Sequence, residues 1–369
     1  MSGNQTAYAL AMLGVGRRSV FSELTDTPPS PRTLPPAGPR LGRMTVADIS
    51  DWYEDLLGPD FHARDINLGP DPEGEGDIVA TLVRYGEPAA SRSAVLWVHG
   101  MTDYFFHEHV ARALDEAGYA FYALDLRKCG RSCQEGQRWH YSTDFRHYFA
   151  ELTVALDLVT AEHPDVIPIA HSTAGMIVPL WAAHLARNDS ARHAKLGGLI
   201  LNSPWLDMMY PKPLVRVLRP VVNILGRVAP GVEIPGGNLG AYGMSIHRDH
   251  HGDWDFDVTF KPVRGHRKYL GWLREVLRSQ ARIHRDEIDV GVPVLTLCSA
   301  GSQLGRPYSD ESTGVDTVLD TRQIQRCAPQ LGEDVTVHPV EGALHDVFLS
   351  KPGPLAEALG TTIDWLRRR

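Results

Sequence analysis

The sequence lacks three features that would place it in a specialised class of proteins. Four cysteines in 369 residues are too few for a disulfide scaffold. No stretch approaches the roughly 20 apolar residues that are needed to span a bilayer. Positive charge is not in excess, because the net charge is -8 and no long basic stripe lies on a predicted helix. We therefore expect a cytoplasmic protein with no transmembrane segment and no nucleic acid partner.

Residues 1–75 are predicted to form an N-terminal arm. A short apolar run at residues 7–15 is followed by two arginines, whereas a secretory signal carries its basic residues before the run, so we expect no signal peptide. Six prolines lie between residues 25 and 43, a composition that favours extended, solvated backbone. We expect a linker or a surface strap here, and an oligomerisation arm in a homo-oligomer stays open as the alternative.

From Ile78 onward, short apolar or β-branched runs alternate with longer amphipathic ones, which is typical of βαβ units that build a parallel sheet. The predicted strands are residues 78–85, 94–98, 119–125, 166–170, 197–202, 292–298 and 335–340. The predicted helices are residues 108–117, 143–162, 173–187, 321–331 and 355–368. We therefore predict an α/β fold whose mostly parallel sheet is flanked by helices.

The alternation stops for about 85 residues, far more than the usual connection between elements. We assign residues 204–289 to an inserted helical cap, and residues 76–203 and 290–369 to the core. Inside the cap, seven apolar residues recur on one face of a predicted helix: Leu214, Val217, Leu218, Val221, Val222, Leu225 and Val228. This face could cover an apolar pocket or simply pack against the body, and the pattern does not decide between the two.

A serine stands at the apex of a predicted sharp turn. Residues 166–175 have the pattern of a strand, a turn and a helix, with Ser172 at the turn. Such a turn holds the serine in a strained conformation, so the residues two before and two after it must be small, as Ala170 and Ala174 are. Glycine is usual at both places. Because the turn follows a strand and precedes a helix, we predict that Ser172 is a nucleophile.

A second turn follows the predicted strand at residues 94–98, which leads into His99 and Gly100. After this strand a backbone N–H must point at the developing oxyanion, and glycine allows that close approach. We assign the oxyanion hole to the N–H groups of Met101 and Thr173. The second begins the helix after the nucleophile, where unpaired donors and the helix dipole favour negative charge.

His345 lies on a glycine-containing loop after the last predicted strand, at the sheet edge where the serine is expected. An imidazole there can act as the base of nucleophilic catalysis, and its place is the third in a Ser, Asp, His order. We choose Asp316 as the acid because it precedes an apolar anchor and the next helix. Asp320 would then cap that helix. Asp207, after the preceding strand, stays open as an alternative acid.

Four motifs in this order resemble the monoacylglycerol lipase and lysophospholipase branch of the α/β hydrolases. They are His99-Gly100, the Asp-x-Arg-x-x-Gly-x-Ser run at residues 125–132, His171-Ser172 and Gly342-Ala-Leu-His345. The run at residues 125–132 is the most specific of them. The resemblance spans residue 78 to the end and implies the same Ser, Asp and His roles, a cap and no cofactor. The alanines in place of glycines and a long polar insertion at residues 300–315 depart from the family pattern.

These residues predict a serine hydrolase that cleaves a carboxylic ester or lactone with a hydrophobic part through an acyl-enzyme. The residues expected to contact this small-molecule substrate are His99, Gly100, Trp205 and Leu218. A peptidase or thioesterase of the same fold is the nearest alternative, and a non-catalytic ligand-binding protein is an alternative of another class. A dehalogenase or epoxide hydrolase is disfavoured because those enzymes carry aspartate at the turn.

Two polar clusters have simpler explanations than a functional site. Residues 247–257 include three histidines and four aspartates, but their spacing matches no helical metal pair, so we expect a polar cap loop and no metal. Cys129 and Cys133 are expected to be free thiols rather than a redox pair. We also interpret His171, next to the nucleophile, as a packing residue.

Overall fold

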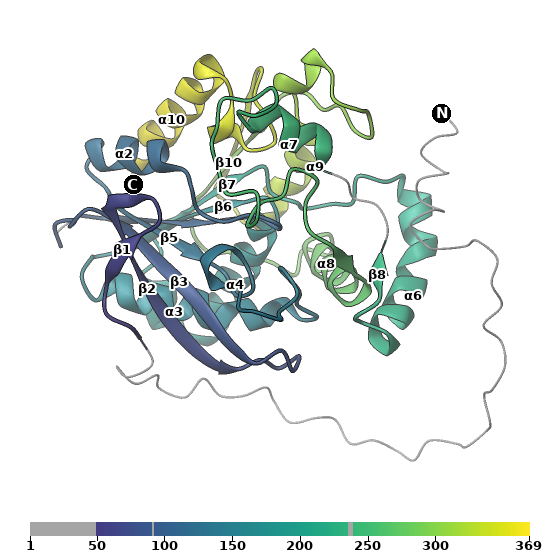
Figure 1. The fold of residues 1–369 in the computed structure, drawn as a ribbon, viewed down its shortest axis with the longest axis horizontal. Coiled ribbons are helices and arrows are strands. Elements are labelled where there is room, and N and C mark those ends of the chain that lie inside the picture. The colour runs from purple at the N-terminus through teal and green to yellow at the C-terminus, as the bar shows by residue number, and fades with distance from the viewer. Residues whose placement is uncertain (1–48, 91, 235–238) are drawn as a thin grey trace.

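A nine-stranded sheet forms the centre of the computed structural model, which describes residues 49–90, 92–234 and 239–369. Its strand order is β1-β2-β3-β5-β4-β6-β7-β10-β11 (Figure 1). In this sheet, the six neighbouring strands β5, β4, β6, β7, β10 and β11 are parallel. The pairings of β1 with β2, β2 with β3 and β3 with β5 are antiparallel. Their bounds are β1 Tyr53–Asp55, β2 Gly58–Pro70, β3 Asp77–Tyr85, β4 Ala94–Val98, β5 Ala120–Asp125, β6 Val166–His171, β7 Leu199–Asn202, β10 Val294–Ser299 and β11 Val335–Val340.

Helices cover both faces of the sheet. The α-helices are α2 Glu108–Glu116, α3 Phe149–Thr160, α4 Ala174–Asn188, α5 Ser190–His193, α6 Lys212–Val228, α7 Gly240–Ile246, α8 Leu270–Ile283, α9 Thr321–Cys327 and α10 Pro352–Leu366. Helices α2 and α10 share one apolar cluster with the sheet, and α3, α4 and α9 share the other. The predicted α/β fold with a mostly parallel sheet is confirmed. No helix in the described ranges is both long and apolar enough to cross a bilayer.

Strand β4 shows why the central strands could be recognised. All five of its side chains are fully buried. Val95 and Trp97 belong to the cluster on one face, and Leu96 and Val98 to the cluster on the other. A strand that is covered on both faces has no polar side, so it has the pattern of a continuous apolar run.

Strand β2 corrects the expected arm. We expected residues 1–75 to lie outside the core, but Gly58–Pro70 pairs with β3 along its length, so that boundary is wrong. Only Phe61, Ala63 and Ile66 of β2 are buried, and polar residues lie between them. A strand near the edge keeps one face partly in water, which hides it from a search for apolar runs. The apolar run at residues 7–15 and the prolines lie outside the described residues.

The alternation of strands and helices breaks between β7 and β10, as predicted. This segment contains α6, α7 and α8 and a two-stranded ribbon of β8 (Glu233–Ile234) and β9 (Lys268–Tyr269). Helix α6 packs against α8 at the end of the molecule opposite β1 (Figure 1). A Cβ on Gly226 would lie 2.7 Å from the Leu270 carbonyl oxygen, so this glycine allows the two helices to approach closely.

Candidate active site

Ser172 lies at the sharp turn between β6 and α4, with a φ of +52°. A non-glycine residue in this region is strained and needs its surroundings to hold it there. Its N–H donates to the Asn202 carbonyl at 2.9 Å, and its carbonyl accepts from the Trp205 N–H at 2.9 Å. Ala170 and Ala174 are fully buried, in keeping with the small residues that the turn requires.

Two residues predicted to contact substrate shape this turn instead. A Cβ on Gly100 would lie 2.9 Å from the Ser172 Cβ, so the loop after β4 needs glycine to pass the serine. His99 is buried, and its Nε2 accepts a hydrogen bond of 3.0 Å from the Leu126 N–H. Neither Gly100 nor His99 lines the pocket in front of Ser172.

Ser172, His345 and Asp316 form a continuous hydrogen-bonded row. The Nε2 atom of His345 is 3.0 Å from the Ser172 Oγ, and its Nδ1 is 2.9 Å from the Asp316 Oδ2. Asp316 is fully buried and His345 is 3% exposed, so the row is largely shielded from water. An imidazole held in this way between a hydroxyl and a carboxylate can move the hydroxyl proton.

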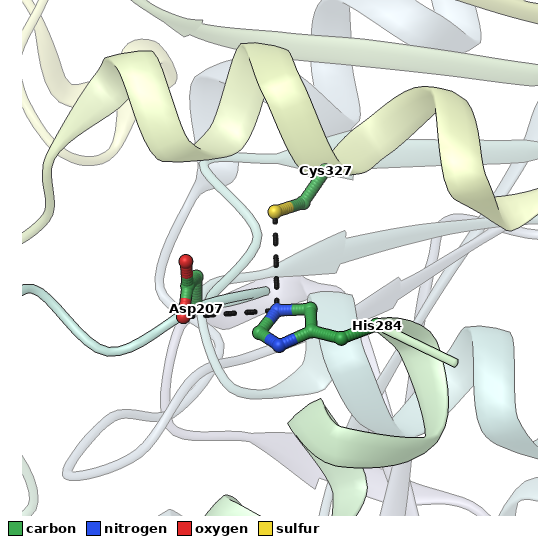
Figure 2. Close-up of side chains that lie close together, drawn as sticks. All are labelled: Asp207, His284 and Cys327. Carbon is green, nitrogen blue, oxygen red and sulfur yellow. Dashed lines mark hydrogen bonds and ion pairs between the residues drawn. The ribbon is translucent and has the colours of Figure 1, made fainter. Parts of the chain in front are cut away.

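The Asp316 carboxylate is held by its own loop. Its Oδ1 accepts from the N–H groups of Val318 at 2.7 Å and Leu319 at 2.8 Å, which leaves Oδ2 for the imidazole. The two alternative acids lie elsewhere. Asp320 accepts from the Arg322 N–H and is the N-cap of α9, as predicted. Asp207 faces His284, outside the pocket at Ser172 (Figure 2).

The pocket in front of Ser172 is walled by the cap and by the loop after β4. Its apolar lining residues are Met101, Leu239, Ile246, Phe256, Pro262, Val263 and Val318. Lys261 of the cap and Asp103 of the core form an ion pair of 2.6 Å in the wall. The ring of Tyr242 stands edge-on to His345, with centroids 5.4 Å apart. Sequence analysis missed Asp103, Tyr242 and Lys261, because no motif marks them and only the folded cap brings them to the pocket.

Trp205 and Leu218 are not brought to this pocket, contrary to our expectation. The Trp205 ring is buried against Trp272 of α8, with centroids 5.7 Å apart. Leu218 lies on α6, which packs on α8 rather than over Ser172. The apolar periodicity of α6 therefore does not mark the roof of the pocket. Most of that face is exposed, at Val217, Val221, Leu225 and Val228.

Two N–H groups at the pocket are free to bind a substrate oxygen. Met101 lines the pocket, and Thr173 directly follows the serine. Within the described residues, neither backbone N–H donates to a protein acceptor. His171 directly precedes the serine and also lines the pocket, and burial lowers its pKa to about 4, so its imidazole is neutral at pH 7. Its Nδ1 is 3.1 Å from the Asn202 carbonyl, consistent with the packing role that we expected.

The run at residues 125–132 forms a loop of buried ion pairs behind the pocket. The Arg127 guanidinium contacts Glu151 at 2.6 Å, and the Arg131 guanidinium contacts Asp55 at 2.6 Å. A Cβ on Gly130, which has a φ of +47°, would clash at 2.4 Å with the Asp125 carboxylate. The fixed order of residue types in this motif is therefore explained by packing and charge pairing.

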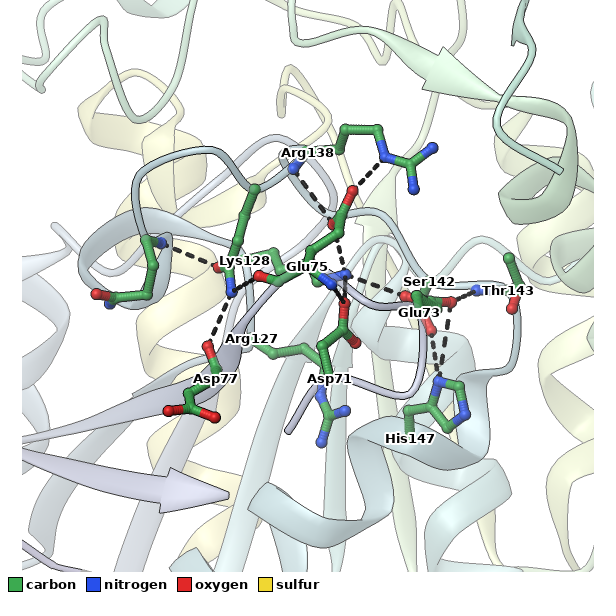
Figure 3. Close-up of polar contacts among 12 residues, drawn as sticks. Asp71, Glu73, Glu75, Asp77, Arg127, Lys128, Arg138, Ser142, Thr143 and His147 are labelled. Carbon is green, nitrogen blue, oxygen red and sulfur yellow. Dashed lines mark hydrogen bonds and ion pairs between the residues drawn. The ribbon is translucent and has the colours of Figure 1, made fainter. Parts of the chain in front are cut away.

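Lys128, in the same run, holds the loop between β2 and β3 (Figure 3). Its ammonium group is fully buried and lies 2.7 Å from Asp71, 3.1 Å from Glu73 and 2.7 Å from Glu75. Burial acts to lower the pKa of Lys128, but the hydrogen bonds that it donates to these carboxylates outweigh burial and raise the pKa above its usual value. Lys128 therefore stays charged and fastens the hairpin to the exit of β5.

Groups of side chains with metal-ligand spacing occur twice in the described residues, and neither lies in residues 247–257. Asp103, His171 and Asp346 form one buried group. Lys261 already pairs with Asp103, and His107 lies 2.9 Å from the Asp346 carboxylate, so protein donors fill this group. The other group consists of Asp207, His284 and Cys327 and lies outside the pocket.

Comparisons with known proteins agree with this fold. The family described as serine aminopeptidase, S33, matches residues 89–351. Among solved structures, the monoacylglycerol lipase of Paleococcus ferrophilus superposes with a TM-score of 0.55 at 21% identity, covering 77% of this chain and 97% of that one. The carboxyl esterase of Bacillus coagulans, in complex with glycerol, gives 0.56 at 15% identity, covering 83% and 98%. The match over most of the chain shows that this protein belongs to the S33 family of α/β hydrolases.

Proposed function

We propose that the protein is a serine hydrolase that cleaves a carboxylic ester or lactone with a hydrophobic part. The observation that carries the proposal is the row from Ser172 through His345 to Asp316 at the end of a pocket with apolar walls. A serine hydroxyl is a weak nucleophile unless an adjacent base removes its proton, and the row supplies that base.

In the proposed mechanism, the Ser172 Oγ attacks the substrate carbonyl carbon while the His345 Nε2 takes its proton. The carbonyl oxygen becomes an oxyanion, which accepts hydrogen bonds from the Met101 and Thr173 N–H groups. Its collapse expels the leaving group, which receives the proton from His345, and leaves an acyl-enzyme on Ser172. Water then attacks with His345 again as base and releases the acid. The Asp316 carboxylate stabilises the imidazolium in both steps.

The pocket walls favour an uncharged, apolar substrate. Seven of the lining residues are apolar, and the cation among the lining residues, Lys261, is neutralised by Asp103. A substrate carboxylate would have to break this buried ion pair to find a partner. A monoacylglycerol lipase and a carboxyl esterase share the fold, in agreement with an ester substrate.

An aminopeptidase is the second candidate, because the matching family carries that description. Recognition of a free α-amino group needs a carboxylate at the pocket, and Asp103 is the carboxylate among the lining residues. Its Oδ1 accepts from Lys261 at 2.6 Å and from the Tyr104 N–H at 3.0 Å, so its charge is already paired with a cation. This pairing is why we favour the ester.

Ser172→Ala tests the proposal. We expect the variant to fold normally, to lose turnover of p-nitrophenyl esters by several orders of magnitude and to lose labelling by a fluorophosphonate probe. Ser190→Ala, at an exposed site on α5, is the matched control and should keep both. Wild-type ester turnover in Ser172→Ala would refute the assignment. Absence of labelling in the wild-type protein would instead favour a non-catalytic ligand-binding protein.

Assays of p-nitrophenyl esters, aminoacyl arylamides and acyl thioesters side by side separate the candidate substrates. We expect the esters to be turned over with the highest kcat/KM. A clear preference for aminoacyl arylamides would overturn the ester assignment in favour of the peptidase, and a preference for thioesters would favour a thioesterase. Either outcome would leave the role of Ser172 in place.

A further inference from the structure

Three side chains of metal-ligand type meet at the junction between cap and core (Figure 2). Asp207 follows β7, His284 is the C-cap of α8, and Cys327 is the last residue of α9. The Cys327 Sγ is 3.9 Å from the His284 Nε2, and the Asp207 Oδ1 is 3.7 Å from the same nitrogen. All three ligand atoms lie within 4.8 Å of one another. None of these residues lines the pocket at Ser172.

These separations suit a tetrahedral zinc ion. Zinc binds thiolate sulfur at about 2.3 Å and imidazole nitrogen or carboxylate oxygen at about 2.0 to 2.2 Å. In a tetrahedron these bonds place the nitrogen about 3.6 Å from the sulfur and about 3.4 Å from the oxygen. The structure has 3.9 Å and 3.7 Å, so the His284 nitrogen needs to approach each of the other two ligand atoms by only about 0.3 Å.

The hydrogen bonding around His284 also indicates a cation. Its Nε2 faces the Leu206 carbonyl at 3.0 Å as well as the Asp207 carboxylate and the Cys327 sulfur. One N–H proton can be shared with the Leu206 carbonyl at 3.0 Å but leaves the carboxylate at 3.7 Å and the sulfur at 3.9 Å without it, whereas a divalent cation can bind several ligands at once. Arg326 holds the Asp207 Oδ2 at 2.7 Å and so turns Oδ1 toward His284. Such a contact orients a ligand without occupying the metal position.

We propose that Asp207, His284 and Cys327 bind a zinc ion that joins the cap to the core. A thiolate with an imidazole selects zinc over magnesium and calcium, which prefer oxygen ligands. A water molecule or the Leu206 carbonyl oxygen completes the coordination. Binding displaces the thiol proton of Cys327 to solvent and requires His284 to carry its proton on Nδ1, so no oxidant or reductant is involved. The side chain of His284 is 27% exposed, which gives the ion a route in.

The location of the site predicts a structural effect rather than a catalytic one. A zinc ion here ties the end of α8, in the cap, to α9, which packs on the sheet. A ligand that binds only the folded protein raises its melting temperature. We therefore expect zinc to raise the melting temperature and to leave ester turnover by the folded enzyme unchanged.

Cobalt serves as the probe because, unlike zinc, it gives a visible spectrum and a near-ultraviolet charge-transfer band when a thiolate binds it. The metal-free full-length protein is titrated with Co(II) in the presence of a non-thiol reductant. We expect one equivalent to produce the thiolate band and Zn(II) to abolish it. Cys327→Ser should lose the band, and Cys133→Ser, a free thiol outside the cluster, should keep it. Zn(II) should raise the melting temperature of wild type and Cys133→Ser only.

His284→Ala provides an independent test, because its partly exposed side chain is removed without opening the core where Cys327 is buried. We expect its Co(II) affinity to fall by at least about 10-fold, as for the loss of one of three ligands. The proposal is overturned if wild type binds Co(II) with no thiolate band, or if Cys327→Ser or His284→Ala binds with wild-type affinity.

Discussion

At the scale of single residues, the orientation of His345 depends on how the Asp316 carboxylate is hydrogen-bonded. Two backbone donors, from Val318 and Leu319, occupy one carboxylate oxygen, so only the other faces the imidazole. In this arrangement Nδ1 of His345 carries the proton, and Nε2 is left to accept the proton of Ser172. Three hydrogen bonds to one carboxylate thus select the tautomer that the proposed mechanism needs.

Asp316→Asn should therefore remove activity without displacing the side chain. The amide oxygen would take the place between the two backbone donors, and the amide NH₂ would then face Nδ1 and force the proton onto Nε2. We expect kcat for p-nitrophenyl esters to fall on the order of 10⁴-fold, as in other triads with this change. Asp320→Asn alters only the N-cap residue of helix α9, so this variant should retain the kcat of the wild type. A small loss in Asp316→Asn would show that this carboxylate does not set the tautomer.

Some of these residues could be predicted and some could not. Ser172, His345 and Asp316 each follow a strand in a fixed chain order, so their meeting at one sheet edge follows from the fold. Asp103 and Lys261 are 158 residues apart, and nothing in either local sequence indicates that they pair. Gly100 was recognised as necessary, but its closest neighbour turned out to be the serine itself.

At the scale of elements, burial on two faces made the central strands predictable, and burial on one face hid β2. The seven strands predicted from apolar runs all occur, with ends that differ by one or two residues. Helix α6 was also predicted, but periodicity could not say which neighbour its apolar face would meet. Val222 of α6 is buried, whereas Val217 and Val228 are about 70% exposed. An apolar stripe specifies a helix, and only the tertiary fold specifies its partner.

The hairpin of β2 and β3 should depend strongly on Lys128. Lys128→Met would leave the buried Asp71 and the largely buried Glu73 without this cation, while Glu75 would keep Arg138, and breaking a buried pair in this way costs about 3 to 5 kcal/mol. Urea denaturation at pH 7 measures the loss in the free energy of unfolding. Lys351→Met breaks an exposed pair with Asp253 and should cost less than about 1 kcal/mol. Equal losses in the two variants would contradict the role of the cluster.

At the scale of the whole molecule, one helix of the cap packs against the core. Helix α8 contacts both α6 of the cap and α4 of the core. Glu275, on α8, is 8% exposed, and burial raises its pKa from an ordinary 4.5 to about 7. Because the folded state then holds a proton that the unfolded state loses, stability falls as the pH rises from about 4.5 to 7, and the loss is complete above that range.

Glu275→Gln should make the protein less sensitive to this rise in pH. The amide cannot ionise, so the variant avoids the cost of a buried charge, which the ion pair with Arg278 offsets only in part. We expect the variant to gain stability over wild type as the pH rises. The difference between their free energies of unfolding should be larger at pH 8 than at pH 5 by about 1 to 3 kcal/mol, in favour of the variant. Glu116→Gln, at an exposed position, should show no such difference between the two pH values. A difference of the opposite sign in Glu275→Gln would contradict the prediction.

The closeness of Gly100 to Ser172 couples two parts of the site, the loop after β4 and the turn that holds the serine. The loop after β4 supplies Met101 and Asp103 to the pocket wall, but a Cβ on Gly100 of the same loop would lie 2.9 Å from the Ser172 Cβ. Any larger residue there would push the serine out of line with His345. If the proposed function holds, redesign of the pocket has to begin beyond residue 100, since a change at that residue would disturb the serine before it altered the choice of substrate.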